Sequence, residues 1–258
     1  MNSKDWQPNQ YLKFANERTQ PSIDLVSHIN LSNPRKIIDI GCGPGNSTQV
    51  LVNKWPNAQV LGIDNSPAMI EKAKSDYPNQ QWKIMDANNL DLNEKYDLVF
   101  SNATIQWLPN HDELIKILAS LTKDKGALAI QLPFYLNMPI SKEVAKVAAK
   151  EKWLAKTNGC FDNFYVYQVG YYYDVLYPLF DRVELWETSY FHVMDSHMAL
   201  MEMIRTTGMK PYLDRLNSDI EKVEFENEIL DRLKTVYPKQ KNGKVLFPFE
   251  RIFFIGNK

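Results

Sequence analysis

Glycines and an acid gather in the segment KIIDIGCGPGNSTQVL, residues 36–51. Gly41, Gly43 and Gly45 follow a short apolar run that contains Asp39. Glycine permits a tight backbone turn and the close approach of a ligand to the backbone. The carboxylate of Asp39 is poorly suited to a neighbouring pyrophosphate but suits a ligand that carries a positive amino group. The segment therefore indicates either a simple turn between a strand and a helix or a turn that binds a nucleotide-like ligand.

Further polar residues end the next apolar runs along the chain. Asp64 ends the second run, at the distance from the glycines where an acid can bind both hydroxyls of a ribose. Asp86 ends the third run, and Asn102 ends the fourth. A single acid at a strand end is most often a turn or cap residue. Together with Asp39, four polar residues in order beside a glycine loop favour a ligand site.

Regular secondary structure must bring these residues together, and the first half of the chain predicts it. Short runs rich in Ile, Val and Leu hardly alternate with polar residues, as in strands buried on both faces of a parallel sheet. These predicted strands are KIIDI (36–40), QVLGI (59–63), QWKIM (81–85), YDLVFS (96–101) and GALAIQ (126–131).

Helical patterns alternate with the predicted strands. Leu114, Ile117, Leu118 and Leu121 recur at i, i+3, i+4 and i+7 and predict one apolar face of a helix. Ser66 is suited to cap another helix, with Pro67 in its first turn. The strand, helix, strand order is expected four times, which predicts an α/β fold with a doubly wound, Rossmann-like sheet. In such sheets, ligands bind beyond the carboxyl ends of the strands.

The second half of the chain predicts a helical cap on a sheet of seven strands, mostly parallel. The run 182–191 reads as a sixth strand, and 244–256 reads as a last strand interrupted by Pro248. No Gly-, Ser- or Pro-rich linker separates a second domain, so a single domain over residues 1–258 is expected. Its core is expected at about 31–133, 171–191 and 244–258, with cap or lid segments at about 1–30, 134–170 and 192–243.

Composition restricts the classes of function. Of the 258 residues, 44% are apolar, and the net charge is −1, so no basic field indicates a nucleic-acid partner. Two cysteines cannot build a disulfide framework or a cysteine-rich zinc site. A signal peptide or an apolar run of membrane-spanning length is not apparent. We therefore expect a cytoplasmic protein that has no membrane or nucleic-acid partner and binds no metal.

Several motifs resemble those of class I methyltransferases that depend on S-adenosylmethionine. They are DIGCGPGNST, GIDNSPAMI, MDANNL and YDLVFSNATIQWL. The whole chain, including DWQPNQYLKFANERTQPSIDLV, IQWLPNH and FPFERIFFI, is similar to the trans-aconitate methyltransferase family. The glycine motif is generic to methyltransferases, whereas the N-terminal block and IQWLPNH are more specific.

The resemblance implies that S-adenosylmethionine contacts the four strand ends. For the methionine part of the cofactor, the residues implied are Asp39 and Gly41 at the amino group, and Asn102 and Ala103. For the ribose they are Asp64 and Asn65, and for the adenine Asp86 and Ala87. Gly43 and Gly45 would allow close backbone approach, and Cys42 and Met69 are implied as further cofactor contacts.

The family forms a monomethyl ester on a carboxylate of a small tricarboxylic acid. A carboxylate is already ionised at neutral pH, so no catalytic base is expected. Rate would come from in-line alignment and from exclusion of water. Arginines and aromatic residues are the expected anchors and walls of the acid site: Tyr11, Arg18, Trp107, Tyr172, Tyr173, Tyr190, His192, Arg205 and Arg251. By contrast, His28, His111 and His197 have no metal-ligand spacing and are interpreted as structural.

Other functions stay open at this stage. Enzymes that methylate nitrogen often carry a Pro-Pro-aromatic signature where this chain has Asn102-Ala-Thr-Ile-Gln-Trp107, which argues against that chemistry. The same fold could act on another small acid or on a carrier-bound malonyl group, or it could bind the cofactor without catalysis. A nicotinamide dehydrogenase is disfavoured, because G-x-G-x-G differs from the dinucleotide fingerprint.

Overall fold

The computed structural model describes residues 15–160, 164–205 and 207–258. The chain divides into two compact units. The first unit comprises residues 1–132, 167–187 and 252–258, and the second comprises 133–166 and 188–251. The division into a core and a cap with the bounds expected above stays a prediction, since a division by compactness does not define domains.

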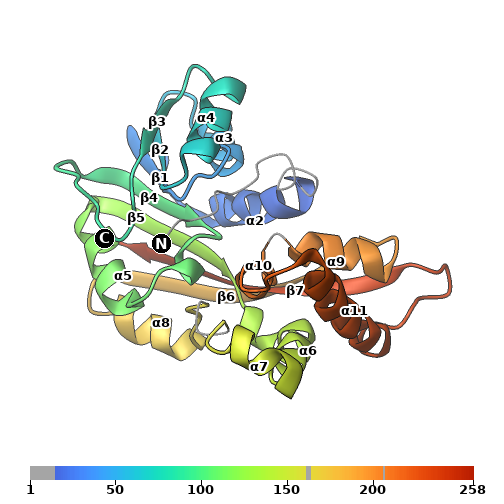
Figure 1. The fold of residues 1–258 in the computed structure, drawn as a ribbon. Coiled ribbons are helices and arrows are strands. Elements are labelled where there is room, and N and C mark those ends of the chain that lie inside the picture. The colour runs from blue at the N-terminus through green and yellow to red at the C-terminus, as the bar shows by residue number, and fades with distance from the viewer. Residues whose placement is uncertain (1–14, 161–163, 206) are drawn as a thin grey trace. The chain divides into compact units, whose positions relative to one another are not determined.

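Seven strands form one sheet in the order β3-β2-β1-β4-β5-β7-β6 (Figure 1). Their bounds are β1 (Lys36–Ile40), β2 (Gln59–Asp64), β3 (Gln81–Ile84), β4 (Tyr96–Asn102), β5 (Thr122–Pro133), β6 (Arg182–Met194) and β7 (Val245–Asn257). The pairs β1–β2, β2–β3, β1–β4 and β4–β5 are parallel.

The last strand runs against the parallel set. Lys258 N donates to Gly126 O (3.0 Å) and Phe134 N donates to Glu250 O (2.8 Å). Residue numbers therefore rise along β5 as they fall along β7, so the two strands are antiparallel. The seven-stranded, mostly parallel sheet predicted from the sequence is therefore confirmed.

Helices of the first unit pack in two groups. They are α2 (Ala15–His28), α3 (Asn46–Lys54), α4 (Pro67–Asp76), α5 (His111–Ser120), α8 (Val169–Leu176) and the 3-10 helix η1 (Ile105–Trp107). Helix α2 packs on α3, α4 packs on β2 and β3, and α5 packs on α8. In Figure 1, α5 and α8 lie together, away from α3 and α4. The predicted start of α4 is confirmed, because the Ser66 hydroxyl accepts a hydrogen bond from Met69 N (3.2 Å).

The order of the strands creates a switch point in the sheet. The chain proceeds outward from β1 through β2 to β3 and then returns to place β4 on the other side of β1. The helices that follow β1 and β4 therefore leave in different directions, and the carboxyl ends of these strands flank the crevice where ligands bind in such folds. Asp39 pairs in register with Phe100, which brings the ends of β1 and β4 side by side.

Two expectations about the elements are wrong. No helix joins β3 to β4, so the strand, helix, strand order occurs three times among the first five strands and not four. The connection, residues 85–95, is rich in Asp and Asn, whose side chains bond to nearby backbone and favour turns. Pro248 does not interrupt β7. β5 ends at Pro133, so the part of β7 that contains Pro248 no longer has β5 beside it. Proline lacks a backbone N–H, and a strand tolerates this where it lies at the edge of a sheet.

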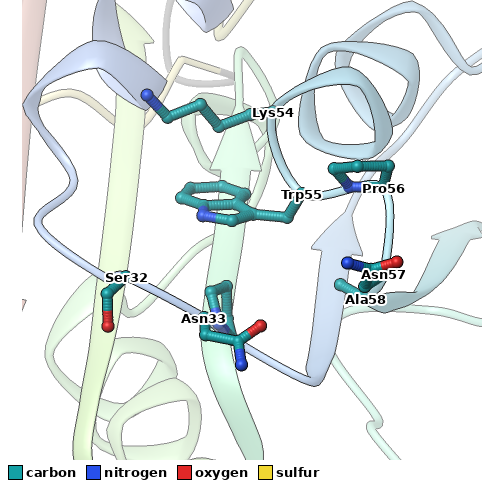
Figure 2. Close-up of a pocket in the computed structure, with 8 residues that line it drawn as sticks. Ser32, Asn33, Lys54, Trp55, Pro56, Asn57 and Ala58 are labelled. Atoms are coloured by element: carbon teal, nitrogen blue, oxygen red, sulfur yellow. The ribbon is translucent and has the colours of Figure 1, made fainter.

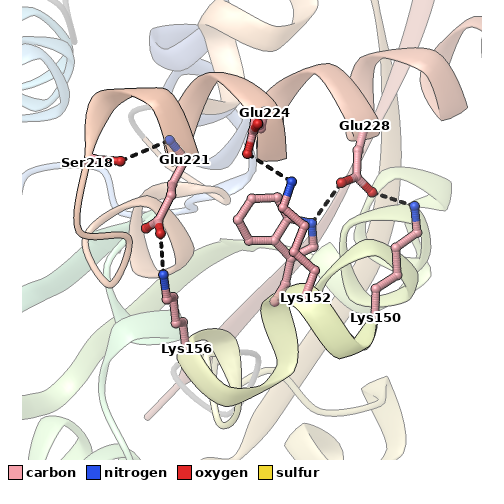
Figure 3. A network of polar contacts seen from close by, with 8 residues as sticks. Lys150, Lys152, Lys156, Ser218, Glu221, Glu224 and Glu228 are labelled. Atoms are coloured by element: carbon pink, nitrogen blue, oxygen red, sulfur yellow. Dashed lines mark hydrogen bonds and ion pairs between the residues drawn. The ribbon is translucent and has the colours of Figure 1, made fainter.

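The second unit is mainly helical apart from the ends of its strands. It contains α6 (Pro139–Ala148), α7 (Glu151–Thr157), α9 (His197–Arg205), α10 (Lys210–Leu213), α11 (Asp219–Val236) and the 3-10 helix η2 (Tyr135–Asn137). Lysines at the start of α7 and along it pair with glutamates on α11 (Figure 3). The buried Trp153 donates to Glu228 (3.0 Å) and packs edge-on against Phe225. Apolar packing and ion pairs thus join α7 to α11.

A shallow pocket of about 120 Å³ lies at the amino end of β1 (Figure 2). Its lining is Ser32, Asn33, Pro34, Lys54, Trp55, Pro56, Asn57 and Ala58. None of the candidate site residues lines this pocket, which lies at the end of β1 opposite the glycine loop. Among the described residues, no helix is both long enough and apolar enough to cross a membrane.

Candidate functional site

The glycine loop after β1 is tightly packed on one side and open on another. All three of its glycines have positive φ: 73° at Gly41, 54° at Gly43 and 97° at Gly45. A Cβ on Gly41 would lie 2.1 Å from the Thr104 hydroxyl, so this position excludes any side chain. A Cβ on Gly43 would meet nothing within 4 Å. The loop is therefore accessible at Gly43.

Asp39 places a carboxylate beneath this loop. Its side chain is fully buried, and one oxygen, Oδ2, accepts from the hydroxyls of Ser47 (2.7 Å) and Thr48 (2.6 Å) in the first turn of α3. The other oxygen, Oδ1, is buried without a hydrogen-bond partner among the described residues. Burial raises the pKa of Asp39 to about 6, because its effect is larger than that of the two hydroxyl hydrogen bonds, which lower the pKa. A cationic donor at Oδ1 would relieve this cost.

Asp64 braces the loop from the end of β2. Its carboxylate accepts from Gly43 N (2.9 Å) and from Ser66 N (2.9 Å). The backbone adds a further link, because Gly41 N donates to Ile63 O (2.8 Å). The half-buried Asp64 thus joins the glycine loop to the start of α4.

The end of β4 packs on the loop from the other side. The Thr104 hydroxyl lies within hydrogen-bond distance of Gly41 O (3.1 Å) and Asn102 O (3.2 Å). Ala103 has a φ of 53°, unusual for a residue with a side chain. The Gln106 side chain donates to Ala103 O (2.7 Å) and supports this turn. Asn102 Oδ1 is buried and has no partner within the described ranges.

Comparisons with known proteins give the family. Residues 31–178 match the methyltransferase-domain family. A trans-aconitate 2-methyltransferase of Rhodopseudomonas palustris (strain BisB18) is 39% identical over 257 residues, covering 98% of this chain and 99% of that protein. The chain belongs to the methyltransferase family. Another trans-aconitate 2-methyltransferase, from Escherichia coli O157:H7, is 37% identical over 254 residues, 98% of each chain. The resemblance predicted from the sequence is confirmed.

Solved structures agree on the fold. The YcgJ protein from Bacillus subtilis has a TM-score of 0.58 at 11% identity and covers 93% of this chain and 98% of its own. Haemonchus contortus phosphoethanolamine N-methyltransferase 2, in complex with S-adenosyl-L-methionine, has a TM-score of 0.56 at 15% identity and covers 92% of this chain and 52% of its own. The ligand of that neighbour is the cofactor predicted for this chain from its sequence, S-adenosylmethionine.

The strand ends fit this cofactor. Asp39 Oδ1 and Asn102 Oδ1 are buried acceptors at neighbouring strand ends, and each needs a donor. The methionine amino group of the cofactor is a cation with several N–H donors. The open side of Gly43 allows a ligand to contact the backbone. The residues present therefore fit the charge of the cofactor's amino group, and Gly43 leaves room beside the backbone.

The remaining predicted cofactor residues differ in exposure. Cys42, Met69 and Ala87 are buried, and burial raises the pKa of the Cys42 thiol well above its usual range. Asn65 is exposed. Asp86 is also exposed, and one of its oxygens accepts from the backbone N (2.9 Å) and side chain (3.0 Å) of Asn88, which forms a turn.

Tyr172, a predicted acid-site residue, lies in the core of the first unit. Its hydroxyl lies 3.0 Å from His111 Nδ1, and His111 Nε2 lies 2.8 Å from Ile105 O. A carbonyl only accepts, so Nε2 carries the proton and Nδ1 accepts from the Tyr172 hydroxyl. Burial lowers the pKa of His111, which keeps the ring neutral. The pair thereby anchors η1 to α8.

The other aromatic candidates of the first unit are Trp107 and Tyr173. Trp107 is half-buried on η1, close after β4, where its N donates to Thr104 O (3.1 Å). Tyr173 is 50% exposed and stacks on Tyr177, with 5.8 Å between ring centroids. Of the three aromatic candidates in this unit, Trp107 lies beside the strand ends.

Three predicted acid-site residues meet in the second unit. Arg251 is buried, with its guanidinium carbon 4.6 Å from the ring centroid of Phe249 and 5.9 Å from that of Tyr190. The His192 ring lies 5.8 Å from Phe249. Alternation along β6 and β7 places these side chains on one face of the strand pair.

Arg205 is separate from this group. Its guanidinium makes a bidentate pair with Glu226, at 2.6 Å and 2.8 Å, between α9 and α11. Tyr11 and the side chain of Arg18 lie outside the described residues. No three potential metal-ligating side chains gather in the described ranges. The expected absence of a metal stays a prediction.

Sequence reasoning missed Ser47, Thr48 and Thr104. The first two follow the glycine motif in the first turn of α3, where a hydroxyl points back toward the preceding strand end, so this signal was available. Thr104 could not be found in this way, because its contact with Gly41 depends on the pairing of β1 and β4.

The glycine loop predicts a contrast between two substitutions. Gly43→Ala should lower the free energy of unfolding by about 1–2 kcal/mol, since alanine is strained at positive φ. Gly41→Ala should lower it further, because Thr104 must also move. Calorimetry with S-adenosylhomocysteine should show weaker binding to Gly43→Ala, since its new methyl group enters the open side of the loop. Equal stability of the two variants would contradict the packing described.

The core position of Tyr172 predicts a loss of stability. Tyr172→Phe leaves the buried His111 acceptor unpaired and should lower the free energy of unfolding by about 1–3 kcal/mol in urea titrations. The exposed neighbour provides a control, and Tyr173→Phe should change it by less than about 0.5 kcal/mol. An unchanged Tyr172→Phe protein that binds acid weakly would instead support the role predicted from sequence.

Proposed function

We propose that this methyltransferase transfers a methyl group from S-adenosylmethionine to a carboxylate of trans-aconitate and forms a monomethyl ester. The observation that carries the proposal is the identity of 37–39%, over nearly the whole chain, to proteins named trans-aconitate 2-methyltransferase. A cytoplasmic location, without nucleic-acid or membrane partners, belongs to the same proposal.

The proposed cofactor site uses acceptors for the charged end of the ligand. Asp39 and Asn102 would accept from the methionine amino group through their buried oxygens. Asp64 would accept from the ribose hydroxyls, beside Asn65. The turn of Asp86 and Ala87 would face the adenine. When bound, the cofactor supplies an electrophilic methyl group on a sulfonium centre.

The proposed reaction needs no base from the protein. A carboxylic acid with an ordinary pKa of about 4 is already a nucleophilic carboxylate at neutral pH. The buried His111 supports this view, because both of its ring nitrogens are occupied within the core. The contribution of the protein would be to align the reacting atoms and to exclude water.

A panel of acids tests the substrate. Methyl transfer to trans-aconitate should exceed transfer to cis-aconitate, citrate and isocitrate, and with saturating cofactor the rate should fall only where the acid itself becomes protonated. Mass spectrometry of the ester and labelled-methyl counting would measure this. Preferred turnover of another acid would identify a different substrate on the same fold. Cofactor binding without transfer to any acid would indicate a non-catalytic protein.

The raised pKa of Asp39 predicts a pH dependence. The folded pKa of about 6 exceeds the ordinary value of 3.8, so the folded protein retains this proton and stability falls as pH rises from about 4 to 6. Binding of a cationic amino group needs the ionised form. Affinity for S-adenosylhomocysteine should therefore fall below pH 6, by up to about tenfold per pH unit.

Asp39→Asn provides the matched comparison. This variant should bind S-adenosylhomocysteine weakly at every pH and should lose the component of the pH dependence that Asp39 provides. Calorimetric titrations between pH 5 and 8 would measure both proteins. Parallel pH curves for the two would assign the dependence to another group.

A further inference from the structure

Gln106 carries a buried amide close to the end of β4. It lies on η1 and is 4% exposed. Its Nε2 donates to Ala103 O (2.7 Å), whereas its Oε1 is buried and has no hydrogen-bond partner among the described residues. An unpaired buried oxygen lowers stability, and an apolar side chain of similar length would avoid this cost. The amide is therefore expected to have a role, and its single bond to Ala103 indicates which one.

The backbone of Ala103 is strained. Its φ is 53°, in the left-handed region that a side chain makes costly. Asn110 and Lys125 are the other described residues with a side chain and a positive φ. Asparagine tolerates this region, and Lys125 is exposed. Ala103 alone of the three directly follows the carboxyl end of a strand, and strained backbone at such a place suggests a functional constraint.

Hydrogen bonds on both sides hold Ala103 in this conformation. Its N donates to Gln131 O (2.9 Å), which continues the pairing of β4 with β5. Its O accepts from Gln106, three residues further along the chain. The first bond belongs to the sheet, whereas the second requires the chain to turn at Ala103. The Gln106 amide therefore stabilises the turn.

The turn sets the positions of the residues on either side of it. Asn102 precedes Ala103 and carries the buried Oδ1 that has no partner among the described residues. Thr104 follows Ala103, and its hydroxyl lies 3.1 Å from Gly41 O. A change of φ at Ala103 would rotate Thr104 relative to Asn102. The contact of the glycine loop with the end of β4 thus depends on this one backbone angle.

Other buried polar groups are less informative. The Ser22 and Tyr135 hydroxyls are also buried and have no partner within the described ranges. Tyr135 belongs to the second unit, which contains none of the predicted cofactor residues. Neither hydroxyl bonds to a described residue of the candidate cofactor site, whereas the Gln106 amide does.

We propose that Gln106 is a positioning residue for the cofactor. Its amide holds Ala103 in the left-handed conformation, so that Asn102 Oδ1 and the glycine loop can contact the same ligand. Gln106 acts through Ala103 and not by touching the cofactor. The inference rests on the proposed function, in its cofactor part only, and does not depend on which acid is methylated. All the residues that it uses belong to the first unit.

Substitution of the amide tests the inference. Gln106→Met keeps a side chain of similar length but removes the N–H donor. It should weaken S-adenosylhomocysteine binding about tenfold in calorimetry, as expected for loss of one buried hydrogen bond. Gln240→Met is the matched control, because Gln240 is an exposed glutamine of the second unit whose amide also donates to a backbone carbonyl, that of Pro238 (3.3 Å). This variant should bind S-adenosylhomocysteine as wild type does.

A glycine at position 103 separates positioning from simple support of the fold. Glycine adopts a positive φ without steric cost, so Ala103→Gly should make the bond to Gln106 less necessary. Adding Gln106→Met to Ala103→Gly should therefore weaken S-adenosylhomocysteine binding less than about threefold. Equal loss of affinity in both backgrounds would overturn the inference. Unchanged affinity with a lower urea midpoint would also overturn it and assign the amide to the fold.

A second variant covers the case in which Gln106→Met does not fold. The amide of Gln106→Asn is one methylene shorter and should not reach Ala103 O, and the same comparison is made with and without Ala103→Gly. Wild type separates this inference from the proposed function. If wild type binds S-adenosylhomocysteine and methylates no acid, the proposed reaction fails, and the cycle still decides the role of Gln106. If wild type does not bind S-adenosylhomocysteine, both fail.

Discussion

The candidate cofactor site of this methyltransferase depends on the burial of the Asp39 carboxylate. An ionised carboxylate without partners is costly inside a protein. Two hydroxyls from the first turn of α3 bond to one oxygen and leave the other for a donor from outside the fold. The fold therefore retains an unmet requirement for a cation, and it does so at the switch point of the sheet, where a ligand can reach it.

Holding that carboxylate in place requires the neighbouring strands. Asp64 on β2 accepts from the glycine loop, and Thr104 after β4 packs against Gly41 at a distance that allows no side chain. The loop is thus clamped between two strand ends and is rigid where it touches them. Of the three glycines in the loop, Gly43 alone has open space where a side chain would lie, so a ligand can approach the backbone there.

The sequence predicts features that depend on local chemistry and misses those that depend on packing. The strands, the glycine loop and the Ser66 cap follow from residue type and spacing within short segments. The helix expected between β3 and β4 was wrong, because local Asp and Asn turns outweighed the repeat pattern. The hydroxyl of Tyr172 and the fork of Arg205 are bound by side chains 61 and 21 residues away in the chain, and no local pattern reveals such partners.

Tyr135 is a second example of a feature that sequence analysis cannot reveal. As an aromatic residue after a strand, it reads as ordinary core, and its packing agrees. What distinguishes it is a missing partner, which becomes visible only when every neighbour has been placed. Asp39 and Asn102 also have buried oxygens without a partner, and there the proposed cofactor would supply the donor. Methyl transfer would neutralise the sulfonium of the cofactor but leave its amino group charged, so these acceptors would bind the cofactor and its demethylated product alike.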